Sequence, residues 1–147
     1  EDDIEHAIAD LLAIEKTVVE GAGAAAFAAV RANPEVFAGK KVGVLLSGGN
    51  IDMRLLSNVV LRELAREGRV FSAVIEIEDR PGILARIATL VGEAGGNILE
   101  VTHNRMLMDT SAKSAMLGVM IEAQDTAHAN EIRAQLQNAG FKLKAQD

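Results

Sequence analysis

The spacing of hydrophobic and polar residues changes along the chain, and the change falls near Gly68. Before this glycine, apolar residues recur every three or four positions over residues 2–16, 17–33 and 55–64, which predicts three helices. Asp2 or Asp3 is available to cap the first helix, with Ile4, Ile8, Leu11, Leu12 and Ile14 on its apolar face.

A continuous apolar run, Val42–Leu46, interrupts this helical pattern. Such a run without polar alternation is typical of a strand buried on both faces, as in a parallel sheet. Because one strand cannot form a sheet, residues 1–68 are predicted to finish a larger α/β domain whose remaining strands lie outside this chain.

After Gly68 the pattern predicts alternating strands and helices in the order βαββαβ, which is the ferredoxin-like α+β arrangement. The strands fall at residues 71–78, 97–105, 114–123 and 141–145, and the helices follow Pro81 and Asp125-Thr126. The residues predicted to face the helices are Phe71, Ala73, Ile75, Ile77, Ile83, Leu84, Ile87, Leu90, Val91, Ala115, Leu117, Val119, Ile121, Ala129, Ile132, Leu136 and Ala139. Apolar residues are also predicted on the other sheet face: Val74, Leu99, Val101, Met116 and Met120. We therefore expect a homo-oligomer, at least a dimer.

Composition excludes several classes of protein. The 147 residues carry a formal charge of −6 and include no Cys, so disulfides and thiolate chemistry are ruled out. Four Phe residues and no Tyr or Trp leave no cationic, aromatic surface for nucleic acid. We expect no membrane-spanning segment, and the acidic start lacks the features of a secretory signal, so a cytoplasmic location is the default expectation.

Two stretches resemble known families. The segment "EIEDRPGILARIATLVGEAGGNILEVTHNR" is similar to the ACT domain, an amino-acid-sensing regulatory module, and this resemblance spans residues 71–145. Upstream, "VEGAGAAAFAAVRAN" and "KKVGVLLSGGNIDMRLL" resemble the C-terminal end of the catalytic domain of pyridoxal-phosphate-dependent threonine dehydratases. The two resemblances together imply the C-terminal portion of a threonine dehydratase: residues 1–68 complete a fold-type II catalytic domain, and residues 69–147 form one ACT domain.

The dehydratase resemblance implies that residues of this chain form part of a pyridoxal-phosphate site. Ser47 would hydrogen-bond the pyridine nitrogen, Gly48, Gly49 and Asn50 would let the backbone pass close to the ring, and Glu20 would lie nearby. A hydroxyl partner leaves that nitrogen unprotonated, which suits β-elimination. The alternatives are an ordinary strand-to-helix turn for these residues and a surface carboxylate for Glu20.

The ACT resemblance implies an amino-acid effector bound by Asp79, Gly82, Ile83, Asn97 and Ile98, between the loop of one domain and the strand of a neighbouring one. Free N–H groups at the start of the helix after Pro81 suit a carboxylate, while Asp79 or Asn97 could hold the ammonium group. The alternative is a structural turn that enters a helix. His6, His103 and His128 lack metal-ligand spacing, so no metal is expected.

Two family motifs are missing from this sequence, the Schiff-base lysine and the glycine run that binds phosphate. The lysines present, which include Lys16, Lys40, Lys41, Lys113, Lys142 and Lys144, have other contexts. We therefore expect no catalytic residue here, no tight pyridoxal phosphate binding and no threonine deamination by this piece alone. The leading interpretation is a regulatory portion of threonine dehydratase. The alternatives are a non-catalytic ACT protein and, more weakly, a nucleotide-binding fragment that lacks G-x-G-x-x-G spacing.

Overall fold

The computed structural model describes residues 1–104 and 114–144. Its residues cluster into two compact units, Glu1–Glu63 and Leu64–Asp147, and the division falls within a helix. Among the described residues, no helix combines the length and the apolar character needed to cross a bilayer. Lys113 and the rest of the polar loop predicted before the third strand of the second unit lie outside the described residues.

The first unit is helical. It contains α1 (Asp2–Ala13), α2 (Gly21–Ala32), the short α3 (Pro34–Phe37) and most of α4 (Met53–Arg66). The second helix ends before Asn33-Pro34, as predicted, because the residue before a proline disfavours helical backbone. A small core joins α1, α2 and α4, formed by Ala7, Ile8, Ala9, Leu11, Val19, Ala24, Ala28 and Val59.

Two details of α1 differ from the prediction. Glu1, not Asp2 or Asp3, occupies the N-cap position, and its side chain makes no capping hydrogen bond. Ile14 follows the helix and is 71% exposed, so it does not extend the apolar face. A side-chain cap of the predicted kind is found instead at α4, where the Asp52 carboxylate accepts hydrogen bonds from the N–H groups of Arg54 and Leu55, both at 3.0 Å.

The strand predicted at Val42–Leu46 is not formed. Residues 40–52 have neither helical nor strand structure, and Leu45 is 81% exposed. The physical reason is the lack of a partner: residues 1–63, all of which the structure describes, contain no strand with which this run could pair.

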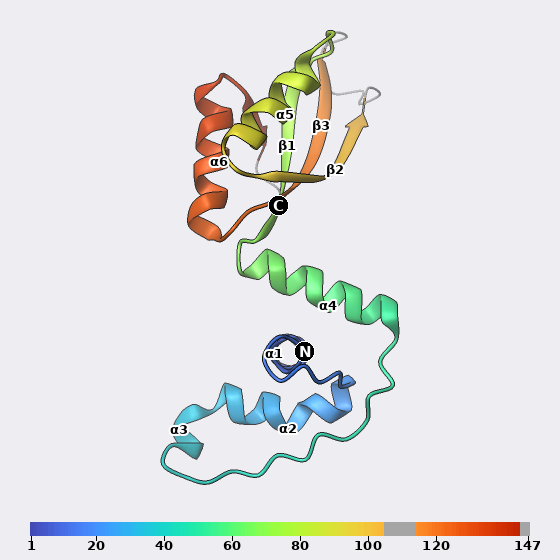
Figure 1. Ribbon diagram of the computed structural model, residues 1–147, viewed down its shortest axis with the longest axis vertical. Coiled ribbons are helices and arrows are strands. Elements are labelled where there is room, and N and C mark those ends of the chain that lie inside the picture. Colours follow the sequence, from blue (N-terminus) through green and yellow to red (C-terminus); the bar gives the residue numbers. More distant parts are fainter. Residues whose placement is uncertain (105–113, 145–147) are drawn as a thin grey trace. The chain divides into compact units, whose positions relative to one another are not determined.

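The second unit has the predicted βαββαβ order (Figure 1). Its elements are β1 (Val70–Glu78), α5 (Ile83–Glu93), β2 (Asn97–Asn104), β3 (Ser114–Glu122), α6 (Thr126–Asn138) and β4 (Lys142–Lys144). The strands form an antiparallel sheet in the order β2-β3-β1-β4, with α5 and α6 on one face. Asp125 caps α6, since its Oδ1 accepts a hydrogen bond from the His128 N–H at 2.9 Å.

The core of this unit lies between the sheet and the two helices. Alternation along β1 and β3 buries the predicted set Phe71, Ala73, Ile75, Ile77, Ala115, Leu117, Val119 and Ile121, and α5 and α6 contribute Ile83, Ile87, Val91, Ala129, Ile132 and Leu136. One prediction is wrong: Leu84 is 41% exposed, because it falls beside the buried stripe of α5. These burials confirm the predicted sheet-and-helix packing.

A β-bulge changes the predicted face of one residue in β2. The pairing with β3 is irregular between Ile98 and Glu100, and Val101 pairs with the core residue Val119. Cross-strand partners share a face, so Val101 lies on the helix side and not on the open face. Val74, Met116 and Met120 remain on the open face, as predicted.

Candidate functional site

The Ser47–Asn50 turn lies against the start of α2. The Glu20 N–H donates a hydrogen bond to the Gly48 carbonyl oxygen at 3.0 Å. Gly23, in the first turn of α2, permits this approach, because a Cβ there would collide with the Ser47 carbonyl oxygen. The structure therefore brings together Glu20 and the glycine turn, which the sequence places far apart.

Gly48 is suited to this contact in two ways. Its φ of +82° lies in the left-handed region that favours glycine, and a Cβ would collide with the Glu20 carboxylate. Glu20 is half-buried, whereas Ser47, Gly49 and Asn50 are exposed. The exposed Ser47 hydroxyl and the glycine turn, with the Glu20 side chain lying against Gly48, could supply one edge of a site for a flat heteroaromatic cofactor.

The second candidate site begins at the loop between β1 and α5. Gly82 occupies the N-cap position of α5 with φ +85°, no side chain caps the helix, and a Cβ at Gly82 would meet open space. The first-turn N–H groups and the helix dipole therefore favour an anion at this point. Oδ1 of Asp79 lies 3.7 Å from Nε2 of His103, across the end of the sheet.

Asn97 and Ile98 open β2, after the other end of α5. The Asn97 amide donates a hydrogen bond to Oε2 of Glu122 at 3.2 Å, and Ile98 is half-buried against the core. Between them and Gly82 lie the 11 residues of α5, a helix about 16 Å long. Within one chain, the structure does not bring the two halves of the predicted effector site together.

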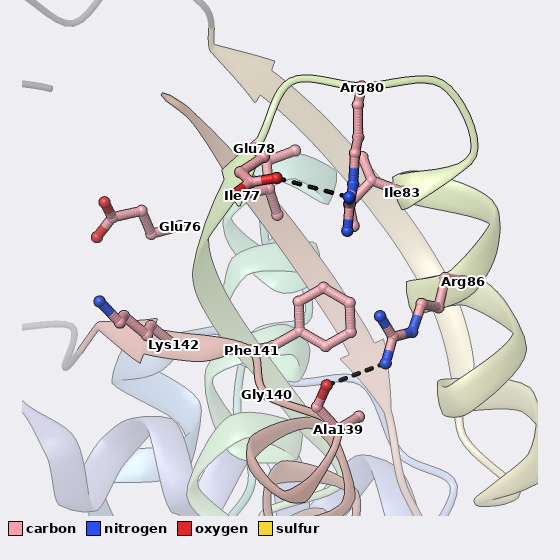
Figure 2. A pocket seen from close by; sticks show the side chains of 10 residues that line it. All are labelled: Glu76, Ile77, Glu78, Arg80, Ile83, Arg86, Ala139, Gly140, Phe141 and Lys142. Carbon is pink, nitrogen blue, oxygen red and sulfur yellow. Dashed lines mark hydrogen bonds and ion pairs between the residues drawn. The ribbon is translucent and has the colours of Figure 1, made fainter. Parts of the chain in front are cut away.

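A surface hollow of about 340 Å³ adjoins the β1–α5 loop and was not predicted from the sequence (Figure 2). Its floor is formed by Ile77, Ile83 and Phe141, all buried. The Arg86 side chain borders it, donating a hydrogen bond to the Ala139 carbonyl oxygen at 3.1 Å, with Cζ 5.3 Å from the centre of the Phe141 ring. These residues come from three separate segments, so local sequence patterns carry no signal for the hollow.

The histidines have structural partners. Nδ1 of His6 lies 2.7 Å from Oε2 of Glu63, and His128 bridges the Gln124 N–H and the Ala94 carbonyl oxygen, at 3.1 and 2.7 Å. Across residues 1–104 and 114–144, no group of three or more acidic and histidine side chains is arranged to hold a metal ion.

Comparison with known proteins defines the class of the second unit. Residues 71–141 match the family model described as the ACT domain. This part of the chain is therefore an ACT domain, in agreement with its βαββαβ order and four-stranded antiparallel sheet.

The whole chain is similar to one group of enzymes. It is 36% identical over 98% of its length to the L-threonine ammonia-lyase of Thermotoga maritima, and 37% identical over 96% to that of Geobacter sulfurreducens. It spans 36% and 35% of these two relatives, about a third of their length. A catabolic L-threonine dehydratase of Staphylococcus aureus is 41% identical over 41% of the chain and is covered to 18%. The chain thus fits the C-terminal, ACT-bearing portion of a threonine dehydratase, which confirms the resemblance found in the sequence motifs.

Proposed function

We propose that this chain is the regulatory portion of an L-threonine dehydratase, the enzyme that converts threonine to 2-oxobutanoate and ammonia. Its ACT domain binds an amino-acid effector and holds subunits together in the cytoplasm. The observation that carries this proposal is the similarity to threonine ammonia-lyases over 98% of the chain, combined with the ACT domain at residues 71–141.

Residues 1–68 contribute one edge of the pyridoxal phosphate site in the intact enzyme. The bound cofactor supplies the electron sink for elimination at the amino-acid substrate. The Ser47 hydroxyl would hold the ring nitrogen by a hydrogen bond, and the turn at Gly48, Gly49 and Asn50 would let the backbone lie close to the ring. Glu20 supports this role because it is already in contact with the turn through Gly48.

The effector site is completed between two copies of the chain. Asp79, Gly82 and Ile83 of one copy would face Asn97 and Ile98 of another, because α5 separates the two groups within a chain. The uncapped first turn of α5 would hold the effector's carboxylate, and Asp79 or the Asn97 amide oxygen its ammonium group. Regulation and oligomerisation are therefore proposed to depend on the same contact.

An amide-resonance titration tests the sensor role. We expect one of isoleucine, valine, threonine and serine to shift the resonances of Gly82, Ile83, Asn97 and Ile98 saturably, and its identity names the effector. Light scattering on the same samples should report at least a dimer. A monomer that responds to none of the four amino acids contradicts the proposal.

We further predict that this chain alone lacks dehydratase activity. The missing Schiff-base lysine and phosphate-binding glycines remove both anchors of the cofactor. The measurement is 2-oxobutanoate formation from threonine with added pyridoxal phosphate, together with the visible absorbance of the protein after gel filtration. Turnover with a retained cofactor band would show the prediction to be wrong.

A further inference from the structure

We propose that the hollow beside Arg86 is a second ligand site, which adjoins the proposed effector site at Ile83 and binds a small organic carboxylate with an apolar side chain. It lies within one ACT domain, between β1, α5 and the turn from α6 to β4 (Figure 2). Asn97 and Ile98 are not among its lining residues.

The charge of Arg86 is the first argument. The two partners of its guanidinium, the Ala139 carbonyl and the Phe141 ring, are uncharged, and within the described part of the chain it forms no ion pair with a carboxylate. These contacts hold the group in place while leaving most of its five N–H donors unused. A fixed, unneutralised guanidinium is suited to bidentate binding of a carboxylate.

The surroundings of Arg86 favour an anion with an apolar body. Figure 2 shows Arg80 reaching toward the same space, whereas Glu76 and Lys142 extend away from it. Arg80 forms a long ion pair of 3.6 Å with Glu78, and both side chains are exposed. Such a pair contributes little stability, so a ligand can take the place of Glu78 at small cost in free energy. The floor residues Ile77, Ile83 and Phe141 are only 4%, 9% and 8% exposed and offer a small apolar area, so any hydrocarbon side chain of the ligand is short.

Two sources share this chemistry, an α-amino acid and the corresponding 2-oxo acid. Both present the carboxylate to Arg86 and the side chain to Phe141. They differ at the α-carbon, where an ammonium group would meet Glu78 and a carbonyl group would not. Valine and 3-methyl-2-oxobutanoate, which have the same side chain, separate the two sources.

The test is an amide-resonance titration of the full 147-residue chain with each of these ligands and with inorganic phosphate. We expect at least one of the two carboxylates to shift Ile77, Arg86, Gly140 and Phe141 saturably, and phosphate to bind more weakly. Arg86→Gln should weaken that binding by about tenfold or more, because it removes a charge-assisted bidentate contact. Tighter binding of valine that Glu78→Gln abolishes would identify the amino acid as the source.

Arg133→Gln is the matched control. Arg133 also lies over a phenylalanine ring, 4.1 Å from the centre of Phe71, but it does not line this hollow. Its substitution should leave the affinity unchanged, and the dispersion of the amide spectrum reports whether each variant is folded.

Asn97→Ala separates this site from the proposed effector site. This substitution should weaken binding of the effector at the site between copies. It should leave unchanged the ligand-induced resonance shifts of residues around Arg86. The proposal is overturned if neither carboxylate shifts these resonances in the wild type, if Arg86→Gln binds as tightly as wild type, or if phosphate binds equally well.

Discussion

Gly82 and Gly92 lie near the two ends of α5 and have different backbone conformations. Gly82, at φ +85°, adopts a conformation that side chains disfavour, although open space surrounds its Cβ position. Gly92 lies within the helix, where a Cβ would also meet nothing. The two positions therefore isolate backbone conformation from steric contact.

This difference predicts opposite effects of the same substitution. Gly82→Ala should lower the free energy of unfolding by about 1 kcal/mol, because a left-handed conformation is strained with a Cβ. Gly92→Ala should raise it by about 0.5–1 kcal/mol, because alanine restricts the unfolded chain and favours helix. Urea unfolding followed by far-UV circular dichroism measures both, and equal effects of the two substitutions would contradict the assigned conformations.

At the scale of elements, α5 is held to the sheet by a narrow buried stripe. Ile87 is fully buried at its centre, while Leu84, on the preceding turn, is 41% exposed. Of the apolar residues of α5, Ile87 packs in the core, whereas Leu84 lies largely outside it.

The stripe predicts a large difference between two similar truncations. Ile87→Ala should destabilise the ACT domain by about 2–5 kcal/mol, since it leaves a cavity in the core. Leu84→Ala, the matched control in the same helix, should cost clearly less, because much of its side chain is already in water. Thermal unfolding of both variants checks the order, and a larger loss for Leu84→Ala would mean that α5 packs on a different face.

The segment at residues 40–52 is the element for which sequence pattern and structure disagree. Its apolar side chains remain exposed, with Leu45 at 81%. Leu45→Ser should therefore change the free energy of unfolding by less than about 0.5 kcal/mol, while reducing self-association, because it removes an exposed apolar side chain. Unfolding and static light scattering are the paired measurements. A substantial loss of stability would show that this segment is packed in solution.

At the scale of the whole molecule, the sequence predicted the ACT domain well because its signals are local. Two-residue alternation in β1 and β3 and the helical spacing of Ile83, Ile87 and Val91 each identify a buried face. The bulge that moves Val101 to the helix side has no comparable signal, since it depends on pairing with β3.

Candidate sites made of contiguous residues could be predicted from the sequence, whereas a site assembled from separate segments could not. Contiguous residues, such as the Ser47–Asn50 turn and the Asp79–Gly82 loop, can be found as motifs. The family resemblance implied only that Glu20 lies near the cofactor, and its contact with Gly48 is seen in the structure alone. The hollow combines Ile77, Arg86 and Phe141, which come together only through the fold.

The central claim is that an amino-acid site is shared between two copies of the chain. The most direct test mixes two variants, Gly82→Asp and Asn97→Ala, and measures effector binding. Gly82→Asp would place a like charge where the effector's carboxylate lies, at a left-handed position that Asp tolerates better than most residues, and Asn97→Ala removes the facing amide. Each variant alone should bind the effector found by titration poorly. Calorimetry on the two variants after co-refolding should recover sites of wild-type affinity, because each mixed dimer contains one interface with both native residues. If the mixture binds no better than either variant while the wild type binds, the site is not shared between copies and the account is contradicted.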